Sequence, residues 1–547
     1  MTRTLLTALL LLAGCATRPP AHDHAPATAA APPPLYDNLG SHTHTVSCSA
    51  AAQAYFDQGL RLIYAFNHDE AQRSFEEAAR LDPNCAMAFW GEALALGPNI
   101  NLPIDAPRGA AAQIAITQAV ALAPHASAKE QAYIAALAKR YSADASADRK
   151  AHDRAYAEAM RDVARTYPDD TDAATLYAES MMDLRPWDLW AADGTPYPGT
   201  VEIVTTLEAV MIRDPNHPGA NHYYIHAIEQ SQQPEKGLPS AQRLPGLVPG
   251  AGHLVHMPSH IYMRTGRYSD AAVANQRAIV VDEQYLAAAQ PTGVYPMMYY
   301  PHNIHFLWAA ASMEGRSADA IGAARLLGTK VPPEMAREMP MVEYFMPTTY
   351  FALLRFGQWD AMLAEPAPPP DLLYLTAMWH YARGIAFAAQ GRSGQADAEL
   401  AAFEHVAAHI PPDRIVGDNQ PAGGLLHLAA IALRGDIAAR QGHFARAVPL
   451  LEEAVRLQDA LPYMEPPPWY FPQRQALGAA LLAAGKPAQA EAVYREDLRL
   501  NPNNGWSLFG LAESLRAQRK TKDAAEVEAQ FKTAWTRADV TLNASRF

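Results

Sequence analysis

Apolar residues recur every three to four positions along most of the chain, and the periodic stretches come in pairs separated by short turns. Two pairs are clearest, residues 59–83, GLRLIYAFNHDEAQRSFEEAARLDP, and residues 476–502, ALGAALLAAGKPAQAEAVYREDLRLNP. No period-two alternation typical of strands competes with this pattern. Because a lone helical hairpin cannot bury its apolar face, the pattern predicts an all-α stack of roughly eight to eleven helix pairs.

These pairs resemble the tetratricopeptide repeat, whose period is about 34 residues. The small, aromatic and proline positions of that consensus are occupied by Gly59, Ala71, Phe75, Ala78 and Pro83, and again by Leu477, Gly478, Ala490, Tyr494 and Pro502. More divergent repeats of the same helix-pair pattern occupy much of the region between these two pairs. The resemblance implies a tetratricopeptide-repeat superhelix of antiparallel helix pairs over residues 49–547, with a concave groove lined by the first helix of each pair.

Length and charge limit the classes of partner. The chain has 547 residues and a formal net charge of -13, without a local basic block that would neutralise phosphates. We therefore expect no nucleic-acid partner.

The N-terminus reads as a targeting segment. MTRTLLTALLLLAGC has one early Arg, an apolar run too short to span a bilayer, and small residues before Cys15. It resembles a bacterial lipoprotein signal, which implies a signal peptide over residues 1–15 and lipidation of Cys15. Ala16 follows where an Asp usually retains such proteins at the inner membrane, so the resemblance implies an outer-membrane lipoprotein facing the periplasm. The lipid would be its only membrane contact, and residues 16–48 form an Ala/Pro/His-rich linker and arm.

Two further cysteines, Cys48 and Cys85, would then lie in an oxidising compartment. Cys48 precedes the first helix of one repeat and Cys85 begins the first helix of the next, and these ends lie side by side in a stack. We expect a disulfide between them. Two unpaired, buried cysteines are the alternative.

Histidines gather in one part of the chain, since eight of the 20 lie between residues 217 and 305. Seven of them fall on helix positions that face the groove in the tetratricopeptide register: His222, His226, His253, His256, His260, His302 and His305. The spacing alone also keeps the side chains of each helix on one face. Pro258 interrupts this stretch, so a helix is expected to start near it, with His253 and His256 in a loop before it. Glu229 lies on the same face as His222 and His226, as a ligand or as a partner that orients an imidazole.

So many adjacent imidazoles are costly to bury unless they share metal ions. Imidazole-rich sites disfavour magnesium and calcium and leave copper, zinc or iron, with copper ahead because methionines lie nearby. More than four histidines indicate more than one ion. The motifs HPGANHYYIHAIE and PGAGHLVHMPSHIYMRTGRY also resemble a family of bacterial tetratricopeptide proteins, often of unassigned function, that carry such histidine motifs.

Aromatic inserts near the histidines are candidates for a substrate pocket, with structured connections between repeats as the alternative. One insert contributes Trp187, Trp190 and Tyr197, and another contributes Glu465, Trp469, Tyr470 and Arg474. Residues 285–300 are a candidate lid. His42 and His44 are candidates to reach the cluster from the arm, whereas His68 lies in a turn and is expected to be structural.

Three functions remain open at this stage. The first is a metal-dependent oxidoreductase that takes a small-molecule or peptide substrate in the groove. The second is metal storage or delivery, which needs exchangeable ligands. The third is an adaptor that binds a peptide partner without metal, the commonest use of these repeats.

Overall fold

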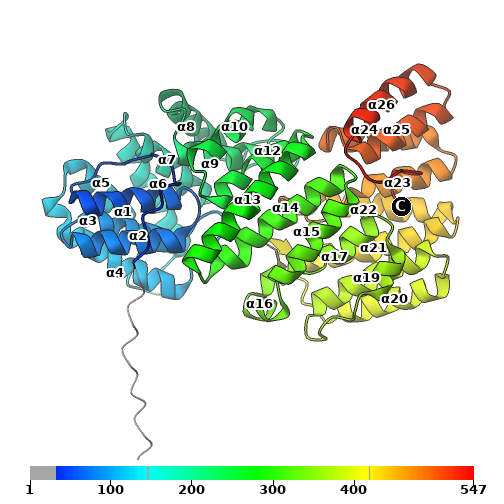
Figure 1. The fold of residues 1–547 in the computed structure, drawn as a ribbon, viewed down its shortest axis with the longest axis horizontal. Coiled ribbons are helices and arrows are strands. Elements are labelled where there is room, and N and C mark those ends of the chain that lie inside the picture. Colours follow the sequence, from blue (N-terminus) through cyan, green and yellow to red (C-terminus); the bar gives the residue numbers. More distant parts are fainter. Residues whose placement is uncertain (1–31, 145–146, 418) are drawn as a thin grey trace, which may run out of the picture. The chain divides into compact units, whose positions relative to one another are not determined.

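The computed structural model describes residues 32–144, 147–417 and 419–547, and residues 33–547 form one compact unit. Cys15 and the predicted signal peptide lie outside the described residues. Nearly all regular structure in the described part is helical (Figure 1).

The first helices run up to the start of the histidine-rich region. They are α1 (Ala50–Ile63), α2 (His68–Leu81), α3 (Ala86–Leu96), α4 (Ala106–Leu122), η1 (Ala123–His125), α5 (Ala128–Leu137), α6 (Arg149–Thr166), α7 (Thr171–Met182) and α8 (Thr200–Arg213). The next helices carry or flank the clustered histidines. They are α9 (Pro218–Glu229), η2 (Pro234–Gly237), α10 (Leu238–Leu247), α11 (Gly252–His256), α12 (Pro258–Arg264), α13 (Tyr268–Ala289), η3 (Tyr295–Tyr299), α14 (Tyr300–Met313) and α15 (Ser317–Lys330).

The C-terminal part continues the stack and holds the one small sheet among the described residues. Its helices are α16 (Pro333–Glu338), η4 (Pro340–Phe345), α17 (Thr348–Arg355), α18 (Trp359–Ala364), α19 (Leu373–Ala389), α20 (Ser393–Ala407), α21 (Ala422–Arg440), α22 (Phe444–Asp459), α23 (Gln473–Ala483), α24 (Pro487–Leu500), α25 (Gly505–Ala517) and α26 (Thr521–Ala534). The strands β1 (Ile415–Val416) and β2 (Gln420–Pro421) pair antiparallel.

Consecutive helices pack as antiparallel pairs, among them α1 with α2, α19 with α20, α21 with α22 and α25 with α26 (Figure 1). The predicted fold, an all-α tetratricopeptide-repeat superhelix, is confirmed.

Close packing of the two helices explains the consensus glycine position in the helix pairs 59–83 and 476–502. A Cβ atom on Gly59 would come within 2.7 Å of the Phe75 ring, and one on Gly478 within 2.3 Å of the Tyr494 ring. Only glycine lets the second helix of the pair approach this closely. The turn at Gly266 has a φ of 69°, in the left-handed region that favours glycine.

The arm before α1 is bound to the helices. His42 and His44 reach Asp172 on α7, and the Ser47 hydroxyl donates to Glu130 on α5. Cys48 and Cys85 form a disulfide that joins the end of this arm to the start of α3, with Cα atoms 5.0 Å apart.

Among the described helices, α21 has the length and apolar composition of a membrane span. However, 67% of its apolar window is buried inside the protein, as expected for a core helix of a repeat stack.

Candidate metal centre

Four helices, α9, α11, α12 and α14, supply the clustered histidines. α9 is buried along its whole length and starts at Pro218, where a proline costs no helical hydrogen bond. Its residues His222 and His226 are one helical turn apart and share a face. α11 ends at His256, and α12 begins at Pro258, as predicted. The expectation of an irregular segment before Pro258 is corrected, because His253 and His256 lie on the short helix α11.

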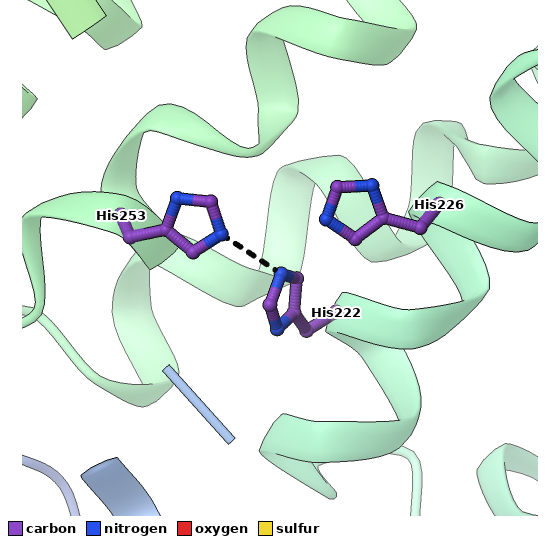
Figure 2. Close-up of side chains that lie close together, drawn as sticks. All are labelled: His222, His226 and His253. Carbon is purple, nitrogen blue, oxygen red and sulfur yellow. Dashed lines mark hydrogen bonds between the residues drawn. The ribbon is translucent and has the colours of Figure 1, made fainter. Parts of the chain in front are cut away.

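The imidazoles divide into two groups of three. The first histidine group, His222, His226 and His253, has ligand nitrogens within 4.8 Å of one another. Its rings turn toward one another, and the Nε2 atoms of His222 and His253 are 3.1 Å apart (Figure 2). In this group the buried Nε2 atom of His226 has no hydrogen-bond partner among the described residues.

The second histidine group consists of His256, His260 and His302, from α11, α12 and α14, and its nitrogens also lie within 4.8 Å of one another. The Nε2 atoms of His256 and His260 are 2.9 Å apart. Each group thus combines two histidines four residues apart in sequence with a third from farther along the chain.

Glu229 connects the two groups. Its Oε1 atom lies 3.0 Å from Nδ1 of His226, and its Oε2 atom lies 2.5 Å from Nδ1 of His260. The carboxylate is fully buried and accepts from one histidine of each group. This is the orienting position that the sequence offered as one of two roles for Glu229.

The other side of each ring fixes which nitrogen carries the proton. Nδ1 of His222 lies 2.7 Å from the backbone carbonyl oxygen of Tyr64, which can only accept. Nδ1 of His256 lies 2.6 Å from Oδ1 of Asn275, whose NH₂ group donates to the Ala271 carbonyl at 2.8 Å. These partners assign the proton to Nδ1 in His222, His226, His256 and His260.

A neutral imidazole with its proton on Nδ1 presents only a lone pair at Nε2. When both rings are neutral, His256 and His260 therefore bring two lone pairs within 2.9 Å, where neither ring donates to the other. His226 likewise points a lone pair into the first group without a donor among the described side chains. Such buried acceptors are costly to leave unsatisfied, and a shared cation relieves them.

Burial disfavours the charged form of four of these imidazoles. Burial, reinforced by the charge that neighbouring imidazoles would carry, lowers the pKa of His222, His253, His256 and His302 well below the usual range. Burial alone would raise the pKa of Glu229, but attraction to His260 in its protonated form and hydrogen bonds from both histidines lower it to about 2. Neutral imidazoles beside an ionised carboxylate are the forms that bind metal ions.

A pocket of about 540 Å³, its mouth included, opens onto both groups. His226 and His253 of the first group line it, as do His260 and His302 of the second group. Val294, Met298 and Tyr299 also line it, and these residues belong to the segment 285–300 that the sequence offered as a lid.

His305 lies apart from both groups. Its ring stacks on Trp308 at a centroid distance of 4.8 Å and meets Tyr344 and Phe345 edge-on at 5.4 Å each. His305, which the sequence predicted to be a ligand, therefore belongs to neither histidine group.

Of the three residues predicted in the first aromatic insert, only Trp187 lines this pocket. Trp187 lines the pocket, with its ring 5.3 Å from that of His226. Trp190 instead donates from Nε1 to the Ala227 carbonyl at 2.8 Å, and Tyr197 lies under the Arg185 guanidinium. Trp190 thus holds the insert against α9, and neither Trp190 nor Tyr197 lines this pocket.

The second insert lines a separate pocket of about 1100 Å³. The residues predicted there are all part of its lining: Glu465, Trp469, Tyr470 and Arg474.

Sequence reasoning missed a further buried cluster around Asp172. This carboxylate accepts from His42 at 2.9 Å, His44 at 2.8 Å, His217 at 3.1 Å and the Tyr64 hydroxyl at 2.5 Å. His42 and His44 thus reach a carboxylate beside the first histidine group rather than the group itself. The His217 Nδ1 atom accepts from the Ala220 N–H, so its Nε2 donates to the carboxylate. The buried Nε2 atom of His44 has no hydrogen-bond partner among the described residues.

Neither a known family model nor a curated protein matches the sequence. Similar solved structures include the APC/C hetero-tetramer Cut9–Hcn1, with 12% identity, a TM-score of 0.33, and coverage of 85% of this chain and 76% of that chain. Yeast Tom70 has 11% identity, a TM-score of 0.27, and coverage of 86% and 89%. The human IFIT1 dimer with PPP-AAAA has 11% identity, a TM-score of 0.35, and coverage of 88% and 91%. All three are tetratricopeptide-repeat proteins, and the fold assignment here rests on the chain's own helix pairs.

Proposed function

We propose that this protein binds two transition-metal ions, one in each histidine group, and is a metal-dependent oxidoreductase. The observation that carries the proposal is the pair of Nε2 lone pairs of His256 and His260, 2.9 Å apart and aimed at each other. The hydrogen bonds behind both rings place a proton on each Nδ1, so when both rings are neutral neither can donate to the other. A cation between them removes this conflict.

The donor set supports copper first. Each group offers three imidazole nitrogens and no carboxylate oxygen, a set suited to copper, zinc or iron rather than magnesium or calcium. Met298, Met339 and Met341 lie in the shared pocket and add soft, polarisable surface beside the ions. Bound copper would exchange electrons between dioxygen and an organic substrate, whereas bound zinc would activate water for hydrolysis.

The burial of the ligands supports resident ions over storage or delivery. Five of the six histidines are buried, which hinders exchange with a partner protein. A largely apolar pocket also borders both histidine groups, and a metal-storage protein does not need such a pocket. We also propose that this metal-binding protein is an outer-membrane lipoprotein that faces the periplasm.

A second candidate is an adaptor that binds a peptide without metal. The repeat fold and the separate pocket of about 1100 Å³, lined by Arg264, Asp459 and Arg474 among others, favour it. The adaptor function leaves the facing Nε2 lone pairs of His256 and His260 unexplained.

Elemental analysis separates these functions. The protein is purified without a histidine tag, reconstituted with copper, zinc or iron, and freed of loose metal by gel filtration. We expect two ions per chain in the wild type and about one in His226→Ala and in His260→Ala. His427→Ala is the matched control, because His427 is exposed and lies outside both groups.

Each variant is also checked for unchanged helicity by circular dichroism. Wild-type protein with less than one ion per chain, or undiminished metal in both group variants, would remove the metal centre and leave the adaptor.

A further inference from the structure

The arm before α1, residues 33–48, passes the starts of both helices that supply the first histidine group. The backbone carbonyl of Asn38 accepts from the N–H of Gly250 at 2.8 Å, just before α11 begins. A Cβ atom on Gly40 would come within 1.9 Å of the Leu247 carbonyl oxygen, so the arm also lies against the end of α10. Because α11 carries His253, this contact fixes the chain just ahead of one ligand.

The arm reaches the start of α9 through Asp172. His42 and His44 donate to this buried carboxylate at 2.9 Å and 2.8 Å. The same carboxylate accepts from Nε2 of His217 at 3.1 Å. Nδ1 of His217 caps the first turn of α9, where it accepts from the Ala220 N–H at 3.1 Å. The arm is therefore bonded, through one carboxylate, to the helix that supplies two of the three ligands of the first histidine group.

Tyr64 extends this contact to a ligand. Its hydroxyl donates to Asp172 at 2.5 Å, and its backbone carbonyl accepts from Nδ1 of His222 at 2.7 Å. A Cβ atom on Gly219 would come within 2.4 Å of the Tyr64 ring, so the ring also packs closely on the first turn of α9. A partner that is itself held in place fixes the orientation of the ligand imidazole that it bonds.

Side chains of α1 hold the backbone of the arm. The N–H of Tyr36 donates to the Gln58 side chain at 2.8 Å, and the N–H of His44 donates to Asp57 at 3.0 Å. These hydrogen bonds exist only while the arm is docked. The rate at which the arm's amides exchange with solvent therefore measures how often the arm opens.

We propose that the arm is a clamp whose docking and the binding of an ion in the first histidine group stabilise each other. An ion would tie α9, through His222 and His226, to α11, through His253, and the docked arm holds the starts of the same two helices. Such coupling is reciprocal, so the arm strengthens ion binding by the same factor by which the ion strengthens docking. In the second histidine group two of the three ligands lie on α12 and α14, so its ion should depend less on the arm. The inference rests on the proposed metal centre.

Two proteins that each keep one group separate the ions. His260→Ala retains the first histidine group and His226→Ala retains the second. In each protein, His42 and His44 are then both replaced by alanine, which removes the arm's bonds to Asp172. The copper affinity of the first group should fall about tenfold, the lower end of the loss seen when an outer partner of a ligand histidine is removed. The affinity of the second group should change less, and both are measured by competition with a chelator at pH 7.5.

Exposed histidines provide the matched control. His427→Ala combined with His443→Ala also removes two imidazoles, but both residues are exposed and lie outside both groups, so the first ion should keep its affinity. Circular dichroism checks each variant for unchanged helicity.

Tyr64→Phe is a milder variant. It removes only the hydroxyl that donates to Asp172 and leaves the arm's own side chains and the backbone carbonyl at His222 in place, so it should weaken the first ion by a smaller factor. Tyr381→Phe is its control, because it removes a buried hydroxyl that bonds to Tyr470 at 3.0 Å, outside both groups. Unchanged affinity of the first group in Tyr64→Phe and in the double alanine variant would overturn the clamp.

Hydrogen exchange measures the reciprocal effect on the arm. At saturating copper, the amides of residues 33–48 should exchange about tenfold more slowly than in chelator-treated protein, because reciprocity fixes the same factor in both directions. Residues 393–407, which form α20, are the internal reference and should be unaffected. In His226→Ala, which lacks the first ion, copper should slow the arm's exchange less. Equal slowing in His226→Ala would show that the first group is not responsible and would overturn the clamp.

Copper content is measured on the same samples, which keeps the two proposals apart. Wild-type protein that binds two ions but exchanges the arm's amides equally fast with and without copper would overturn the clamp and leave the metal centre standing. Wild-type protein that takes up no copper, zinc or iron would remove the metal centre and the clamp together.

Discussion

Glu229→Gln is the substitution that most sharply tests how the two histidine groups are joined. The carboxylate accepts from Nδ1 of His226 at 3.0 Å and from Nδ1 of His260 at 2.5 Å, one in each group. Glutamine keeps the size of the side chain but has one acceptor oxygen, and its NH₂ group would face an N–H. One of the two histidines therefore loses its partner, and both groups lose a buried negative charge.

The expected size follows from the role of such partners. Removing a group that orients a ligand histidine typically lowers metal affinity about 10–100-fold, which is about 1.4–2.7 kcal/mol. We expect this loss at the ion whose histidine loses its hydrogen bond. The other ion should weaken by less, because a neutral acceptor replaces a charged one.

The affinities of both ions are measured by competition with a chromophoric chelator at pH 7.5. Glu399→Gln is the matched control, because Glu399 accepts from Nδ1 of His380 at 2.6 Å in a histidine–carboxylate pair outside the two groups. Wild-type affinity for both ions in Glu229→Gln, a loss confined to one ion, or an equal loss in Glu399→Gln would refute the bridging role of Glu229.

Three further predictions concern the rest of the chain. Replacing Cys48 and Cys85 by serine opens a bond across 37 residues and should lower the free energy of unfolding by about 2–4 kcal/mol; no change under non-reducing conditions would contradict it. Burial lowers the pKa of His68 to about 3, so below about pH 6.5 only the unfolded chain gains a proton there and stability falls by about 1.4 kcal/mol per pH unit. In His68→Asn, chelator-treated protein should lose that part of the acid dependence, and an unchanged slope of stability between pH 6.5 and 5 would count against it. Cys15→Ser should move the full-length protein from the membrane fraction to the soluble fraction or to unprocessed precursor, and equal fractionation would exclude the lipid anchor.

The repeat fold could be predicted because its cause is local. The packing of Gly59 on Phe75 and of Gly478 on Tyr494 requires particular residues at fixed spacings, and those spacings are visible in the sequence. The shared face of His222 and His226 is predictable for the same reason, since helical geometry alone determines it.

The division into two groups was not predictable from spacing. His253 and His256 are three residues apart, yet α11 ends at His256 and sends them to different groups. His302 and His305 share α14, but only His302 reaches a group, because His305 packs on Trp308. Spacing shows which residues share a helix face, whereas the position of neighbouring helices decides where each ring ends.

The partners behind the rings gave little or no signal in the sequence. Tyr64 holds His222 through its backbone carbonyl, 158 residues away, and any residue type supplies that atom. In the sequence, nothing distinguishes Asn275 from other polar residues of α13, and only the structure shows that it contacts His256. Asp172 gathers His42, His44 and His217 across more than forty residues in every case, a distance over which no local pattern extends.

Anomalous diffraction at the copper edge, from crystals of copper-reconstituted protein grown without chelating buffers, tests the central claim most directly. Two peaks are predicted, one among the Nε2 atoms of His222, His226 and His253 and the other among those of His256, His260 and His302. Data collected below the edge should lose both peaks, and His260→Ala should lose the second while keeping the first. An anomalous map with no peak at either group, from protein that contains copper by elemental analysis, would contradict a metal centre built from these histidines.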